Sequence, residues 1–170
     1  MQAELYPETI ARPKRSDKLI IEQAAKKHAE EIARQIKDID AEALAEDLVE
    51  HYRSYQNGYD LAKDLEREGY EIDVEFVNLL DDFDYAVGSA QRDAEKEWVQ
   101  KVGFTPEFKV GDHVDMGKAY GKNNERYGFV SEIKMESAEY YVKSNSDSGI
   151  SYVIKAENLK PYNPEENAEN

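Results

Sequence analysis

Three aspartates in one short run are the residues of this chain with the clearest capacity for chemistry. Asp81, Asp82 and Asp84 lie on either side of Phe83, and carboxylates grouped in this way can hold Mg²⁺ together with water. Zinc sites and hydrolytic sites usually add histidine or cysteine. The chain has no cysteine, and its three histidines lie far apart in the sequence. Acidic segments produce such runs by composition alone, so we expect no metal, no cofactor and no catalytic residue.

A second candidate is the loop between Gly117 and Gly128, which is rich in glycine, lysine and tyrosine. A phosphate-binding P-loop has four residues between its first glycine and its Gly-Lys pair, whereas this loop has three between Gly117 and Gly121. Asn123 also occupies the position where a P-loop has serine or threonine. A P-loop is therefore excluded. The basic and aromatic side chains could still contact a phosphate backbone or an acidic peptide, and the alternative is a mobile hairpin loop. These possible secondary contacts are Lys118, Tyr120, Lys122 and Arg126.

The strongest signal in the sequence is the uneven distribution of its charge. Residues 38–102 contain 19 acidic and 6 basic side chains, a net charge of −13. Residues 1–37 have a net charge of +2, and residues 103–170 have −4. The acidic segment should repel nucleic acid and anionic membranes. We therefore expect a basic partner, and no direct binding of duplex DNA by the acidic half.

Hydrophobic spacing predicts an acidic helical domain over residues 17–102. Apolar residues recur at three- and four-residue steps from Ile21 to Ile36 and from Ala41 to Tyr55. Asp17 and Asp40 are the expected N-caps of these two helices.

Two further helices are expected in this domain. The first is short and runs from Tyr59 to about Glu68. The second begins after Asp73 and reaches about Lys101, with a coiled-coil-like apolar seam from Phe76 to Ala94. Gly88 should either admit a neighbour closely or break this long helix.

After Gly103 and Pro106 the pattern changes to short β-branched and aromatic runs separated by turn residues. The expected strands are Val110–Met116, Tyr127–Ile133, Glu139–Lys143, Ile150–Lys155 and a last strand that ends at Tyr162. The order Val-Gly-Asp-x-Val, Gly-x-Val, Tyr-Val and Asn-Leu-Lys-Pro resembles the SH3-like barrels of bacterial and phage proteins. This resemblance implies an SH3-like β-barrel over residues 108–162 and no particular activity. The predicted fold class is α+β, a helical domain followed by a small barrel.

The two ends of the chain are expected to lie outside both domains. Residues 1–16 form an arm whose basic run, Arg12–Arg15, should pair with the protein's own acids. Residues 163–170 form a polar tail that we expect to be disordered. The sequence has no signal-peptide pattern at its start and no apolar run of membrane-spanning length. These features predict a cytoplasmic protein, in the host cytoplasm if it is phage-encoded.

The acidic helices and their tyrosines together predict a surface that binds a basic protein. Carboxylates can replace phosphates, and tyrosines add contact area at low entropic cost. Like charges at four-residue spacing lower the stability of a helix. Stability alone would favour a lysine at one of the positions of Glu42, Glu46 and Glu50, so this row indicates that the charges serve a function. The predicted partner-binding residues are Glu42, Glu46, Glu50, Asp81, Asp82, Asp84 and Tyr85.

In size, acidity, absence of cysteine and appended barrel, the chain resembles the small acidic proteins that phages and mobile elements use against restriction or CRISPR systems. The resemblance implies a non-enzymatic inhibitor or regulator that binds a nucleic-acid-handling protein by nucleic-acid mimicry. The alternative is an adaptor or structural module that forms a homodimer along its long helix while the barrel recruits a protein or peptide. An enzyme is the third hypothesis.

Overall fold

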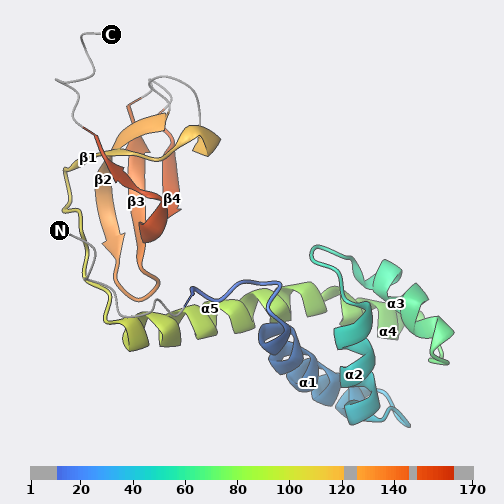
Figure 1. Ribbon diagram of the computed structural model, residues 1–170. Helices are drawn as coiled ribbons and strands as arrows, with labels where there is room; N and C mark the ends of the chain where they lie inside the picture. Colours follow the sequence, from blue (N-terminus) through green and yellow to red (C-terminus); the bar gives the residue numbers. More distant parts are fainter. Residues whose placement is uncertain (1–10, 121–125, 146–148, 163–170) are drawn as a thin grey trace. The chain divides into compact units, whose positions relative to one another are not determined.

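The computed structural model describes residues 11–120, 126–145 and 149–162 (Figure 1). It contains two compact units, residues 1–98 and residues 99–170. The described elements of the first unit are helices, and the described strands all lie in the second unit, so the α+β fold class is confirmed. None of the described helices is both long and apolar enough to cross a membrane. The predicted tail, Lys122 and the first ten residues of the arm lie outside the described residues.

Five helices occur in the described part of the first unit, the last of which continues past the division between the units. Their bounds are α1 (Lys18–Gln35), α2 (Ala41–His51), α3 (Gly58–Arg67), α4 (Val74–Asp81) and α5 (Phe83–Val102). The Asp40 carboxylate accepts from the backbone N–H groups of Glu42 and Ala43 at the start of α2. Asp73 caps α4 in the same way through Phe76 N–H. These caps satisfy donors that the first turn of a helix leaves unpaired.

Asp17 precedes α1 as expected, but its side chain does not cap that helix. Its carboxylate instead accepts a hydrogen bond from the backbone N–H of Lys14, at 2.8 Å. The aspartate therefore closes a turn in the arm.

The core of the first unit follows the predicted apolar faces in part. Ile21 and Ala41 are only partly buried, and Tyr55, the end of the second predicted stripe, is 82% exposed. The most deeply buried large side chains are Ile32, Leu44, Leu48, Leu61, Leu65, Phe76, Leu80 and Phe83. His28 is buried among them, with Nε2 2.8 Å from the carbonyl oxygen of Leu79. That bond satisfies a ring nitrogen that burial would otherwise leave unpaired.

The one long helix predicted after Asp73 is present as two helices. The segment is divided into α4 and α5 by a single residue, Asp82. Asp82 retains helical dihedral angles, with φ −77° and ψ −10°, so the interruption is small. It lies where the first residue of α3 contacts the last turn of α4, because Gly58 N–H donates to the Asp81 carboxylate at 2.5 Å. This contact joins segments that are 23 residues apart in sequence, and helical periodicity contains no sign of it.

The described strands of the second unit form one antiparallel sheet with the order β4-β3-β2-β1-β5. Their bounds are β1 (His113–Asp115), β2 (Tyr127–Lys134), β3 (Glu139–Ser144), β4 (Ser151–Lys155) and β5 (Lys160–Pro161). The separate core of this unit gathers around Tyr140, whose hydroxyl accepts from the backbone N–H of Glu107 at 3.0 Å. The five predicted strand runs are all present in shorter or similar form.

The closed SH3-like barrel is not supported, because the sheet is open. Closure would require β4 to pair with β5, whereas these two strands are its edges. β5 contains only Lys160 and Pro161, and proline has no N–H group to donate to a further strand. The order of turn and strand residues that suggested a barrel is compatible with an open sheet.

Gly58 tests the contact that separates α4 from α5. An added Cβ would lie 2.5 Å from both the backbone nitrogen of Asp81 and the carbonyl oxygen of Val77. We expect Gly58→Ala to lower the free energy of unfolding by about 1–3 kcal/mol, since backbone atoms must move to admit the methyl group. Asn78→Ala, at an exposed position of α4, should change it by no more than about 0.5 kcal/mol. Urea unfolding followed by circular dichroism measures both, and equal stability of the two variants would refute the close approach.

Candidate protein-binding surfaces

Glu42, Glu46 and Glu50 form a row along the exposed side of α2, which we call the α2 acidic row. Its direction follows from the burial of Leu44 and Leu48, because residues two positions away on a helix point to nearly the opposite side. All three glutamates are exposed. None of their carboxylates forms a hydrogen bond or ion pair with another residue of the described chain. Among the described residues, the row is therefore a set of unpaired charges on one helix.

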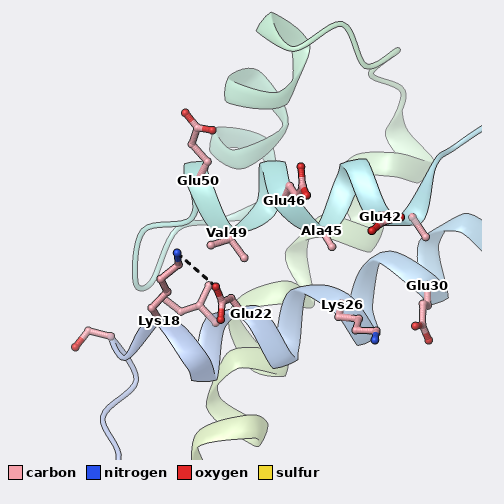
Figure 2. A pocket seen from close by; sticks show the side chains of 12 residues that line it. Lys18, Glu22, Lys26, Glu30, Glu42, Ala45, Glu46, Val49 and Glu50 are labelled. Carbon is pink, nitrogen blue, oxygen red and sulfur yellow. Dashed lines mark ion pairs between the residues drawn. The ribbon is translucent and has the colours of Figure 1, made fainter.

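The α2 acidic row borders a groove between α1 and α2, with a volume of about 1030 Å³ (Figure 2). The two helices are antiparallel, so that Lys18 lies near the Glu50 end and Glu30 near the Glu42 end. Val49 and Ala45 point toward α1, and Glu50 points away from it. The lining residues are Ser16, Lys18, Ile21, Glu22, Lys26, Glu30, Ala41, Glu42, Ala45, Glu46, Val49 and Glu50.

The two walls of the groove differ in how their charges are compensated. On α1, Glu22 pairs with Lys18 at 3.5 Å and Glu30 pairs with Arg34 at 3.7 Å. The glutamates of the α2 wall have no such neighbours in the described chain. Since two lysines and five glutamates line the groove, it has a net charge of −3, and the α2 wall is the negative side.

Asp84, another predicted contact residue, is the centre of a bonded cluster. Its carboxylate accepts hydrogen bonds from the Tyr52 hydroxyl at 2.6 Å and from the Tyr55 backbone N–H at 2.9 Å. It also pairs with the Arg15 guanidinium at 2.6 Å, and Arg15 donates to the Asp84 carbonyl oxygen. The Asp84 carboxylate thus holds together the arm, the residues that follow α2 and the start of α5.

The same cluster shifts the acidity of its members. Partial burial by itself would raise the pKa of Asp84, but the hydrogen bonds from Tyr52, Tyr55 and Arg15 outweigh it and lower that pKa below its ordinary value. Burial and the neighbouring Asp84 carboxylate raise the pKa of Tyr52. Asp84 is therefore ionised and Tyr52 protonated at neutral pH, as their hydrogen bond requires.

The arm pairs with acids of its own unit, as its basic run predicts. Arg12 lies 3.8 Å from the Glu95 carboxylate and 4.6 Å from the centre of the Trp98 ring. Arg15 passes over Gly88, where an added Cβ would lie 2.9 Å from Arg15 Nη1. Of the two roles expected for Gly88, close approach of a neighbour is the one found, and α5 continues through it without a break.

The remaining predicted residues of this region are divided between internal bonds and the surface. Asp81 accepts from Gly58 N–H, and so it is used within the fold. Asp82 is exposed at the end of α4. Tyr85 is 70% exposed, with the Arg92 guanidinium 5.4 Å from its ring centre. The structure does not bring the three aspartates together as ligands, and the described residues contain no group of three or more His, Cys, Asp or Glu side chains that could hold a metal ion.

Tyr55 is an exposed aromatic residue that the predicted set omits. Its side chain is 82% exposed, and its backbone has φ 67°, a left-handed conformation that is unfavourable for a bulky residue. The bond from its N–H to Asp84 stabilises that conformation. The groove floor was also missed, although Ala41, Ala45 and Val49 form a second apolar stripe beside Leu44 and Leu48. The side chains of this second stripe pack against the edge of the core and are only partly buried, and the width of this apolar face was the available signal.

The predicted basic-aromatic loop of the second unit is partly used in internal contacts. Arg126 forms an ion pair with Asp115, with Nε 2.9 Å from a carboxylate oxygen, and this bond lowers the pKa of Asp115. Tyr120 packs edge-on against Tyr152, with ring centres 5.6 Å apart. Lys118 is exposed, and Lys122 lies outside the described residues. Of the described members, Lys118 alone is left entirely to the surface.

Comparison with known proteins adds no family to this geometry. The chain matches no protein-family model, no curated protein and no solved structure.

The Asp84 cluster makes a prediction about stability and pH. We expect Asp84→Asn to lower the free energy of unfolding at pH 7 by about 1.5–3 kcal/mol, since bonds to an ionised group are lost. Because folding lowers the pKa of Asp84, the ionised carboxylate stabilises the fold above the ordinary pKa of 3.8. That contribution is lost as the pH falls through the lowered folded-state pKa.

The difference between wild type and Asp84→Asn should therefore be complete at neutral pH and shrink on acidification. Asp82→Asn is the matched control, because Asp82 is exposed and makes no side-chain bond with a described residue. Urea unfolding between pH 7 and pH 3 measures the difference. A constant difference across this range would show that the charge of Asp84 is unimportant.

Proposed function

We propose that this protein is a non-enzymatic inhibitor or regulator that binds the basic surface of a nucleic-acid-handling protein through the α2 acidic row. The observation that supports this proposal most directly is that Glu42, Glu46 and Glu50 are exposed, aligned and unpaired within the described chain. Three like charges at this spacing destabilise an isolated helix. A complementary positive surface would convert that cost into binding energy.

The geometry of the row is compatible with replacement of a nucleic-acid backbone. Four residues of α-helix advance about 6 Å along the axis, whereas duplex DNA carries one charge per roughly 1.7 Å. A single row is thus a sparse substitute for a duplex. Other exposed acids among the predicted contact residues, such as Asp82, would have to add to the field that attracts the partner.

The burial of the apolar seam disfavours the alternative hypothesis of an adaptor that dimerises through its long helix. It required the apolar seam between Phe76 and Ala94 to face a second copy. Phe76, Leu80, Phe83 and Val87 are instead almost completely buried in the core of their own unit. A homodimer along this seam would require that core to open, which favours the acidic-surface proposal.

The proposal can be tested by competition for DNA. Purified restriction endonucleases and CRISPR effector complexes are each bound to fluorescein-labelled duplex, and the protein is added while anisotropy is measured. We expect displacement of DNA from at least one of them. The variant Glu42→Gln/Glu46→Gln/Glu50→Gln should need on the order of tenfold more protein, because lost interfacial charge pairs cost at least about 1.4 kcal/mol in total. Its melting temperature should stay the same or rise slightly.

A control variant separates the row from net charge. Glu66→Gln/Glu71→Gln/Glu75→Gln removes the same number of charges from exposed positions outside α2, and it should compete almost as well as wild type. If the two triple variants are equally weakened, only the overall charge acts. If neither is weakened, the α2 acidic row is a solvated face and the proposal fails.

A further inference from the structure

The groove beside the α2 acidic row has an apolar floor of defined length. Ala41, Ala45 and Val49 contribute its α2 side and Ile21 its α1 side, and all four are only partly buried. Alanine leaves a helix surface low, so that another backbone can approach closely. The stretch from Ala41 to Val49 is about 12 Å long at 1.5 Å per residue. That length corresponds to about two turns of a helix lying in the groove.

The charged rim has the same repeat as the floor. Glu42, Glu46 and Glu50 follow one another at intervals of about 6 Å, which equals the axial spacing of residues i and i+4 on a partner helix. The walls are helices whose backbone groups are bonded internally, so they offer no ladder to an extended peptide. A helix satisfies its own backbone groups and suits such a groove better.

We infer that the α1–α2 groove binds an amphipathic α-helix of a partner protein, with apolar side chains on the floor and Lys or Arg at four-residue intervals along the α2 wall. This inference rests on the proposed function and specifies the form of the basic partner. A second copy of this chain fits poorly, because each copy has a net charge of −15 and like charges oppose association.

The probe is a synthetic helix-forming peptide with Leu on one face and Lys at every fourth position along the edge of that face. A peptide of the same composition with these residues scattered around the helix is its control. Binding to the full-length protein is measured by fluorescence anisotropy, and perturbed backbone amides are mapped by NMR. We expect the patterned peptide to bind at least about tenfold more tightly than the scattered one, a difference of about 1.4 kcal/mol.

Two kinds of variant distinguish the groove from the charge. Ala45→Leu fills the floor without changing charge, and Ala41→Leu does the same at the other end in case the first variant is unstable. Each should weaken the patterned peptide by on the order of tenfold. The triple glutamine variant of the α2 acidic row should weaken it as well, and binding should fall as salt is added. Perturbed amides should lie on both α1 and α2.

Different results would overturn different claims. If the leucine variants bind normally and the perturbed amides are confined to α2, the groove inference is wrong and the proposed function stands. If the glutamine variant binds normally, the proposed function fails as well. Equal binding of both peptides would also refute the inference. Concentration-dependent dimerisation that perturbs the groove amides would instead assign the groove to a second copy of the chain.

Discussion

The Asp84 carboxylate is the interaction on which the arrangement of the helical unit depends. It joins the arm through Arg15, the end of α2 through Tyr52 and the connection to α3 through Tyr55. A carboxylate can accept several hydrogen bonds while it carries a full charge, which makes it a suitable junction for three separate segments. Its hydrogen bond from Tyr52 also connects the end of α2, the helix that carries the α2 acidic row, to the start of α5.

Several aspartates of this unit bond within the fold, whereas the glutamates of the α2 acidic row do not. Asp40 and Asp73 accept hydrogen bonds from backbone N–H groups at the starts of α2 and α4. Asp81 accepts from the Gly58 N–H, and Asp47 accepts from the Tyr70 hydroxyl. Asp64 is bonded by Arg53, Gln56 and Arg67. The shorter side chain loses less rotamer entropy when it is fixed and reaches nearby backbone donors. The exposed glutamates of α2 are thereby left as surface charge, although both residue types contribute equally to the composition that first suggested a basic partner.

Each of the two units buries its apolar side chains in a core of its own. In the first, helix faces from distant parts of the sequence enclose aromatic side chains, including Tyr52 and Phe83 in an edge-on contact with ring centres 5.1 Å apart. In the second, Phe104 and Phe108 both pack edge-on against Tyr140. Each unit has its own hydrophobic core, and the α2 acidic row and its groove are formed by residues of the helical unit.

Although periodicity and capping residues did not predict the exposure of Tyr55 or the role of Asp17, they were sufficient to predict most of the helix faces, the strand runs and the exposure of Glu42, Glu46 and Glu50. These features depend on neighbours within a few positions. The interruption at Asp82, the open sheet and the internal use of Asp81 and Asp84 depend on partners far away in sequence, such as Gly58 and Arg15. The sequence by itself determined that this protein is acidic, helical and then β-stranded. Only the tertiary structure decided which carboxylates accept hydrogen bonds within the fold and which remain exposed at the surface, because a hydrogen bond requires that its two partners lie close together in space.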